Sequence, residues 1–291
     1  MVTSFQQRDG LGRPLWIKHI LEYVTIRQNA DGGYNFCQGV ESGGQDTYYA
    51  LAIFNLLDVP APKLKMTVRR LRAFPADNIY GYFYVITGLT LCGETVDDEL
   101  VNRVLALRKP HGGFGEVDVD IEAYSEFDAT YKATEILREI EVSVDSEPTI
   151  RWLLKYLNVD GGFAAGKRSN LTSTFHAVAA LHNLGYPVKE LNQTLNFVRS
   201  CEKEGGGFTS VPDTTFPYLE HTYAGVLTLD IMGQKCTYLE DTEKLVLGLQ
   251  NSNGGFRRSI QLGISTFEDT YYAISVLKQL RARTISELNY Q

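Results

Sequence analysis

Two kinds of stretch alternate along the chain, and together they predict an all-α protein built from paired helices. Stretches of the first kind are amphipathic, with apolar residues at helical spacing such as Leu153, Leu154 and Leu157. This spacing gathers the apolar side chains on one face of a helix. Stretches of the second kind are richer in small and aromatic residues. The first kind includes residues 16–27, 147–157 and 241–249, and the second comprises residues 46–56, 78–93, 126–137, 173–184, 220–232 and 266–280.

A Gly-Gly-aromatic motif separates the first and second helix of most pairs. It occurs at residues 32–34, 112–114, 161–163, 206–208 and 254–256. Glycine suits a turn in which the chain leaves a helix with a positive φ. Successive motifs lie roughly 45–50 residues apart, and the first gap is about twice as long because a degenerate repeat at residues 78–93 fills it. The repeat therefore predicts six helical hairpins.

The first and last units indicate that the hairpins close into a ring. Residues 46–51 read DTYYAL and residues 269–274 read DTYYAI. An open solenoid needs distinct capping repeats at its two ends, whereas similar end units are natural when they lie side by side. We therefore predict one domain over residues 1–291, an all-α (α/α)6 toroid with the second helices around a central cavity. Residues 1–15 are expected to form an N-terminal lead-in.

Composition and charge narrow the class of partner. The chain has 291 residues, 28 Lys and Arg against 35 Asp and Glu, and a net charge of −7. This acidic balance, with no basic run, argues against nucleic acid as a partner. No apolar stretch reaches the roughly 18 residues of a membrane span, and residues 1–15 lack the apolar run of a signal peptide. The four cysteines are scattered and form no CxxC pair, so we expect reduced thiols and a cytoplasmic location.

The repeat resembles that of a known superfamily. Residues 28–34 (QNADGGY) followed by residues 46–51, and residues 250–256 (QNSNGGF) followed by residues 268–273, resemble the repeat of protein prenyltransferase β subunits and of squalene and terpene cyclases. The resemblance covers nearly the whole chain and implies the toroid fold. It also implies an isoprenoid or comparably long apolar substrate. An enzyme, either a prenyltransferase or a terpene-type cyclase, is favoured over a noncatalytic protein. One fold hosts several chemistries, so the implied reaction is less specific than the implied fold.

The starts of the second helices carry the candidate catalytic residues. Aligning these helices gives Asp46, His221 and Asp269 equivalent positions in units one, five and six, which are neighbours in a closed ring. We expect their side chains to surround one mouth of the central cavity. Asp128 lies one residue from this position in unit three. A histidine with two carboxylates suits a divalent metal such as zinc, with magnesium as a further candidate, or acid/base catalysis. The alternative is that the aspartates cap their helices.

Aromatic and basic residues are candidates for substrate binding. Aromatic faces stabilise a passing carbocation, although packing between helices would use the same side chains. Two basic pairs, Lys167–Arg168 and Arg257–Arg258, follow Gly-Gly-Phe motifs and are candidates for a diphosphate, with solvated loop charges as the alternative. The aromatic candidates are Tyr48, Tyr82, Tyr131, Phe175, Tyr223 and Tyr271.

The chain departs from the resembled families at their reactive residues. The zinc-binding Asp, Cys and His of prenyltransferases align with Pro217, Leu219 and Asp269, so the family zinc site is not retained. The cyclase acid motif Asp-x-Asp-Asp is incomplete at residues 118–121 and 213–215. The leading interpretation is therefore an isoprenoid-handling enzyme without that zinc site, and a terpene-type cyclase without its acid motif is one alternative.

Two further alternatives belong to other functional classes. Subunits that this chain resembles normally need a partner subunit, so a noncatalytic ring that binds a partner protein stays open. A large apolar patch on the outer helices would favour it. The other alternative is a different (α/α)6 enzyme that acts on sugars with paired carboxylates, which a polar cavity with two acids would favour.

Overall fold

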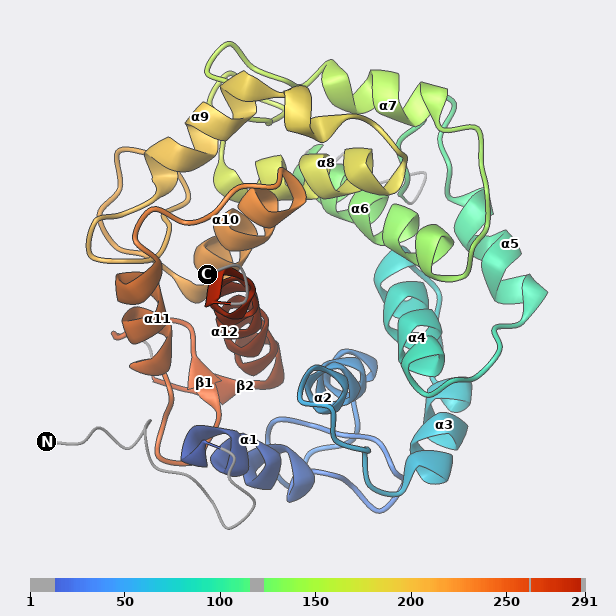
Figure 1. The fold of residues 1–291 in the computed structure, drawn as a ribbon. Coiled ribbons are helices and arrows are strands. Elements are labelled where there is room, and N and C mark those ends of the chain that lie inside the picture. Colours follow the sequence, from blue (N-terminus) through green and yellow to red (C-terminus); the bar gives the residue numbers. More distant parts are fainter. Residues whose placement is uncertain (1–13, 116–122, 262, 289–291) are drawn as a thin grey trace, which may run out of the picture.

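The fold is a closed ring of helices in two layers (Figure 1). The computed structural model describes residues 14–115, 123–261 and 263–288. The outer layer comprises α1 (Leu15–Thr25), α3 (Leu64–Ala73), α5 (Asp98–Ala106), α7 (Glu147–Leu154), α9 (Asn192–Cys201) and α11 (Leu239–Leu247). The inner layer comprises α2 (Gly44–Leu56), α4 (Ile79–Leu91), α6 (Ala123–Glu139), α8 (Leu171–Asn183), α10 (Leu219–Ile231) and α12 (Phe267–Leu288).

Each inner helix packs against the next one around the ring, and α12 packs against α2. The last inner helix therefore meets the first, and the predicted (α/α)6 toroid of six hairpins is confirmed. Apart from the helices, the described residues include one short 3₁₀ helix (Val188–Glu190) and a two-stranded antiparallel ribbon of β1 (Phe256–Arg257) and β2 (Ser265–Thr266). None of the described helices has the length and apolar character needed to cross a membrane.

In five units, the Gly-Gly-aromatic motif is hydrogen-bonded to the inner helix of the same unit. The five motif aromatics are buried, and each backbone N–H donates to a threonine hydroxyl in the first turns of the inner helix that follows. The donor and acceptor pairs are Tyr34 with Thr47, Phe114 with Thr130, Phe163 with Thr174, Phe208 with Thr222, and Phe256 with Thr270. A polar group that would otherwise be buried without a partner is satisfied in this way in five units.

The first glycine of the motif packs against the outer helix of the next unit. Gly161 has a φ of +89°, and a Cβ there would lie 2.2 Å from the backbone oxygen of Gln193 at the start of α9. A side chain at this position would be strained and would also clash with backbone. Glycine therefore lets consecutive units approach closely enough to bury the motif aromatic.

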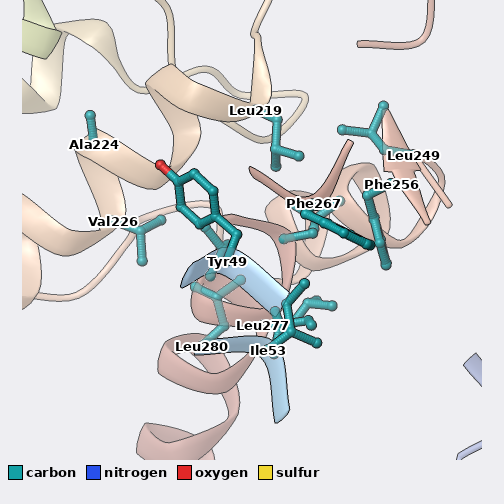
Figure 2. Close-up of a cluster of buried hydrophobic side chains, with 14 of the residues drawn as sticks. Tyr49, Ile53, Leu219, Ala224, Val226, Leu249, Phe256, Phe267, Leu277 and Leu280 are labelled. Carbon is teal, nitrogen blue, oxygen red and sulfur yellow. The ribbon is translucent and has the colours of Figure 1, made fainter. Parts of the chain in front are cut away.

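The same contact closes the ring between the last and first units. A Cβ on Gly254 would lie 2.1 Å from the backbone oxygen of His19 in α1. Gln250 Nε2 donates to the backbone oxygen of Trp16 at 2.9 Å, and the Tyr23 hydroxyl donates to that of Ser265 at 3.0 Å. The hydrophobic cluster that contains Trp16 and Tyr23 of α1 also contains side chains from α2, α10 and α12, several of which Figure 2 shows.

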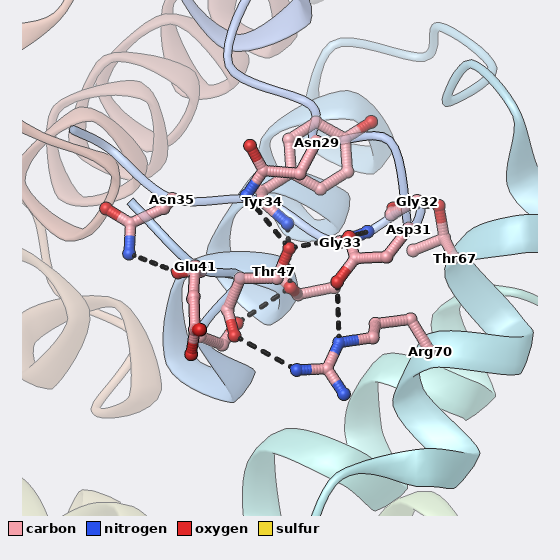
Figure 3. A network of polar contacts seen from close by, with 12 residues as sticks. Asn29, Asp31, Gly32, Gly33, Tyr34, Asn35, Glu41, Thr47, Thr67 and Arg70 are labelled. Atoms are coloured by element: carbon pink, nitrogen blue, oxygen red, sulfur yellow. Dashed lines mark hydrogen bonds and ion pairs between the residues drawn. The ribbon is translucent and has the colours of Figure 1, made fainter. Parts of the chain in front are cut away.

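The loop of unit one shows how polar groups fix the turn before an inner helix (Figure 3). Asp31 accepts hydrogen bonds from the Ser42 hydroxyl at 2.7 Å and from the Gly33 N–H at 3.0 Å. Its other carboxylate oxygen lies 2.9 Å from Nε of Arg70, which belongs to α3 of the next unit. The loop is therefore bonded within its own unit and to the neighbouring one.

Unit two lacks the motif but keeps an inner helix with an asparagine N-cap, as α8 has in unit four. The Asn78 side chain accepts the N–H of Gly81 at 2.9 Å and so caps α4. Tyr82 stands where the other five units have their threonine, and it is buried in the core around α4. The degenerate unit therefore keeps the helix and its N-cap but lacks the bond between the motif and a threonine of the inner helix.

Candidate functional site

The five threonines that bind the motif aromatics put the inner helices in a common register. The residue before each threonine is the helix-start position of the sequence alignment, which holds Asp46, His221 and Asp269 in units one, five and six. The register that the sequence predicted is therefore the structural one. What the structure adds is which face of each helix points toward the centre.

A central cavity of about 190 Å³ lies among the inner helices. Its lining side chains occupy the position before the helix-start position and the positions two and three residues after it. These positions are related as i, i+3 and i+4, so they lie on one face of a helix. The lining residues are Tyr48, Tyr49, Tyr80, Phe83, Tyr84, Asp128, Tyr131, Lys132, Thr172, Phe175, His176, Tyr223, Glu268, Tyr271 and Tyr272.

Six aromatic side chains, one from each inner helix, surround this cavity at the same position. They are Tyr48, Phe83, Tyr131, Phe175, Tyr223 and Tyr271, and we call them the aromatic ring. In five of the six neighbouring pairs of the ring, the side-chain ring centroids lie 5.2 to 6.4 Å apart. The distances are 5.2 Å for Tyr48 and Phe83, 5.4 Å for Tyr131 and Phe175, 5.5 Å for Phe175 and Tyr223, 6.0 Å for Tyr223 and Tyr271, and 6.4 Å for Tyr271 and Tyr48. Between the remaining two members, Lys132 Nζ lies 4.6 Å from the Phe83 centroid and 5.9 Å from that of Tyr131.

Five of the six aromatic residues predicted from the sequence belong to this ring. Tyr82 does not line the cavity, because it occupies the threonine position and points into the core between layers. The residue that takes its place is Phe83, with Tyr84 beside it. The available signal was that the position two residues after the helix start is aromatic in all six units.

One side of the cavity carries a cluster of Asp128, Lys132 and His176, which we call the Asp128 cluster. Asp128 Oδ1 lies 3.3 Å from Lys132 Nζ and 3.6 Å from His176 Nε2. Burial alone would raise the pKa of Asp128, but His176, which is protonated at the low pH where Asp128 titrates, and Lys132 hold it below the usual range. Burial lowers the pKa of His176 to about 4, against the pull of Asp128, so this imidazole is neutral at neutral pH. Asp128 is therefore an ionised carboxylate with a fixed counter-ion.

The opposite side of the cavity carries Glu268. Its Oε1 accepts the hydroxyl of Tyr49 at 2.7 Å and that of Tyr272 at 2.9 Å. Burial raises the pKa of both tyrosines well above its usual value, so their hydroxyls remain protonated donors. Glu268, Lys132 and His176 were not among the residues predicted for the site, because the helix-start position was expected to surround a mouth of the cavity.

The helix-start residues Asp46, His221 and Asp269 do not line the central cavity. Asp269 accepts the Thr266 hydroxyl at 2.8 Å, and the same hydroxyl accepts the Asp269 N–H at 2.9 Å, which is the reciprocal bonding of a helix N-terminus. Asp46, in the first turn of α2, accepts the Phe36 N–H at 3.4 Å. Burial raises the pKa of each of these carboxyls to about 6.

His221 packs edge-on against Tyr218, and its buried Nδ1 has no hydrogen-bond partner among the residues that the structure describes. Burial lowers its pKa, while Glu220 raises it and Arg258 lowers it further. Within the described ranges, no three His, Cys, Asp or Glu side chains are placed to share a metal ion. His221, Asp269 and Asp46 therefore do not form the ligand set expected for zinc or magnesium.

The predicted basic pairs also lie away from the central cavity. Lys167 and Arg168 are exposed, and Arg168 lies 3.7 Å from the exposed Asp213. Arg258 bonds to Glu220 and lies over the Tyr218 ring at 4.8 Å, while Arg257 is half-buried. The incomplete acid motif at residues 118–121 lies outside the described residues.

Comparisons with solved structures show proteins of similar fold. A geranylgeranyltransferase-I from Candida albicans, solved with GGPP, shares 15% identity over 83% of this chain and 85% of its own, with a TM-score of 0.67. A variant of the type II terpene cyclase MstE from Scytonema, with geranylgeranyl dihydroxybenzoate, shares 13% identity over 92% and 97%, with a TM-score of 0.63. A glycosidase variant solved with glucose shares 12% identity over 92% and 96%, with a TM-score of 0.58.

At these identities the structural matches establish the fold alone. Among curated proteins, no sequence matches the chain. The family model of the prenyltransferase alpha-alpha toroid domain matches residues 2–76, 69–170 and 165–290, which together span almost the entire chain. The chain therefore belongs to the prenyltransferase alpha-alpha toroid family.

Proposed function

We propose that this protein is an isoprenoid-handling enzyme that binds the hydrocarbon part of its ligand in the central cavity. The observation that supports this proposal is the aromatic ring, to which every inner helix contributes one side chain. Such a wall is suited to a branched apolar group through area burial and to a cationic intermediate through the ring faces. Two proteins of similar fold were solved with geranylgeranyl compounds.

The size of the cavity restricts the part of the ligand that enters it. A volume of about 190 Å³ is below the roughly 300–1,000 Å³ of sites that enclose drug-sized ligands. A short branched hydrocarbon group is therefore the part that we expect to enter without rearrangement. A complete geranylgeranyl chain would require tyrosines of the wall to change rotamer.

The charges of the cavity favour a ligand without a diphosphate. Among the described residues that line its wall, the cationic side chain is Lys132, and Asp128 already neutralises it. The predicted catalytic role of Asp128 is consequently that of a fixed anion, because its lowered pKa makes it a poor proton donor at neutral pH. His176 is neutral at that pH, so Asp128 and Lys132 are the charged members of the Asp128 cluster.

Thermal unfolding with added ligands tests this function. Geraniol and farnesol are compared with their diphosphates, each with and without zinc or magnesium. A ligand at about 100 times its Kd stabilises a protein by roughly 2.7 kcal/mol, or about 5–10 °C for a chain of this size. We expect the alcohols to raise Tm and the diphosphates to add nothing further. No shift with any of the four would overturn the proposal, and a shift confined to diphosphate with metal would overturn its diphosphate-free form.

A sugar-binding enzyme is the second candidate, because two carboxylates from opposite sides, Asp128 and Glu268, face one aromatic cavity. Aromatic faces and acids are the groups that a glycosidase uses, and a glycosidase is among the proteins of similar fold. Adding glucose as a further ligand to the same unfolding series separates the two candidates. A shift with glucose and none with geraniol or farnesol would favour the sugar-binding enzyme.

The noncatalytic ring with a partner subunit gains less support. Large apolar side chains that are exposed in the described part of the chain lie mostly in loops. On the outer helices they are Leu64 and Met66, both at the start of α3. This distribution is not the broad outer patch that a partner subunit would cover.

A further inference from the structure

The two carboxylates of the central cavity differ in their counter-charges. Asp128 has an ammonium group at 3.3 Å. Glu268 forms no ion pair with any residue that the structure describes, and the hydrogen bonds it accepts there are those of two neutral phenols. With His176 neutral, two carboxylates therefore face one ammonium group, and the cavity carries an excess negative charge on the Glu268 side.

The wall around Glu268 is aromatic. The Tyr49 centroid lies 5.4 Å from that of Tyr271, 6.2 Å from that of Tyr84 and 6.3 Å from that of Tyr272. These rings are buried or half-buried and line the same cavity as the carboxylate. Electron-rich ring faces beside an anion form an environment that attracts a cation with little bound water.

The Asp128 side shows that this wall accommodates a cation. Lys132 Nζ lies between 4.6 and 5.9 Å from the centroids of four rings, those of Tyr80, Phe83, Tyr84 and Tyr131. Its counter-ion Asp128 lies on the same helix. Tyr84 belongs both to this group of rings and to the group around Glu268. The Glu268 side therefore repeats the arrangement of rings and carboxylate without a cation of its own.

We propose that the Glu268 side of the central cavity binds a compact organic cation, a methylated ammonium group, with Glu268 as its counter-ion. This inference rests on the proposed function in taking the cavity as the ligand site, and it identifies the polar end of the ligand as an ammonium group. A small divalent metal ion suits the site less well, because it needs several oxygen or nitrogen ligands and the phenols are protonated donors.

Isothermal titration calorimetry with choline and its neutral carbon isostere, 3,3-dimethylbutan-1-ol, tests the inference. The two compounds have the same shape and differ in charge. We expect choline to bind about tenfold or more tightly than the isostere, since desolvated cation–π contacts and a carboxylate act on the charge alone. Equal affinities, or no binding of either compound, would overturn the inference. This comparison uses the unaltered protein and depends on no variant.

A pair of matched variants assigns the effect to Glu268. Glu268→Gln removes the counter-ion, and Asp213→Asn makes the same change of net charge at an exposed residue that does not line the central cavity. We expect Glu268→Gln to weaken choline binding about tenfold with little effect on the isostere. We expect Asp213→Asn to leave the binding of both compounds unchanged. Equal losses in the two variants would contradict the role of Glu268.

The outcomes also separate this inference from the proposed function. Stabilisation by geraniol or farnesol without binding of choline would remove the inference and leave the proposed function. Binding of choline without stabilisation by any prenyl compound would do the reverse.

Discussion

The carboxylates of Asp128 and Glu268, on opposite sides of the central cavity, have different interaction partners. Asp128 lies beside the ammonium group of Lys132 and the imidazole of His176, and the same ammonium group contacts Phe83 of the aromatic ring. Glu268 accepts two phenol hydroxyls and has no cation beside it among the described residues. The first arrangement is complete within the protein, whereas the second leaves a charge that a ligand can match.

The energetic difference follows from what remains when one partner is removed. Breaking a buried ion pair leaves an unpaired charge in a poorly solvated place, which is costly. Losing a phenol hydrogen bond to a carboxylate that borders a cavity costs less, because water can replace the donor. The Asp128 side should therefore contribute mainly to the stability of the fold and the Glu268 side mainly to ligand binding.

Removing Asp128 is expected to have the largest effect on stability. In Asp128→Ala, Lys132 stays buried without its counter-ion, and we expect a loss of about 3–5 kcal/mol in the free energy of unfolding measured with urea. The double variant Asp128→Ala with Lys132→Met removes both charges and should recover most of this loss. A loss below about 1 kcal/mol in the single variant would show that the pair is not a stability determinant.

Acid titration should reveal His176 as the next largest contribution. Its folded pKa of about 4 lies below the unfolded value of 6.5, so the unfolded chain binds the proton more readily. The stabilisation is complete above pH 6.5 and is lost as pH falls from there toward 4, by about 3 kcal/mol.

His176→Gln is the matched variant for this titration. The variant should lack the loss that His176 causes, so the difference in unfolding free energy between the two proteins should change by about 3 kcal/mol as pH falls from 6.5 toward 4. Asp46 and Asp269, whose raised pKa makes them gain stability over this range, titrate in both proteins and cancel in that difference. Parallel profiles from urea unfolding at each pH would contradict the assignment to His176.

Weakening the Glu268 side should have a smaller effect on the fold. Tyr272→Phe keeps the ring and removes one donor to Glu268, and we expect a loss of about 1 kcal/mol in the same urea assay. The matched change Tyr49→Phe should give a similar value. A loss as large as that of Asp128→Ala would remove the difference between the two sides.

The smallest effects are expected for charges outside the cavity. Arg168 and Asp213 form an exposed pair, with side chains 73% and 87% accessible, so Arg168→Ala should change the unfolding free energy by less than about 0.5 kcal/mol. The ligand-induced shift in Tm should also be unchanged. A reduced shift would indicate that the loop of Lys167 and Arg168 belongs to the binding site.

The repeat explains both the success and the error of the sequence interpretation. Three features recur along the chain with one period: glycines at close approaches, threonines one residue after the helix start and aromatics two residues after it. The toroid and its register could therefore be predicted. The register alone did not say which helical face points to the centre. Asp46, His221 and Asp269 share an equivalent position, and the structure uses Asp269 at its helix N-terminus instead of on the cavity wall.

The sequence by itself determined the six hairpins, the closed ring and five members of the aromatic ring, because these depend on local turn chemistry and a repeated pattern. Only the tertiary structure decided that Asp128, Lys132 and His176 meet on one side of the cavity and Glu268 meets Tyr49 and Tyr272 on the other. These residues come from helices α2, α6, α8 and α12, far apart in the chain. Their proximity depends on which side chains of different helices meet when the ring closes. The repeated aromatic position marks the inward face of each helix, but no local pattern specifies the contacts between helices.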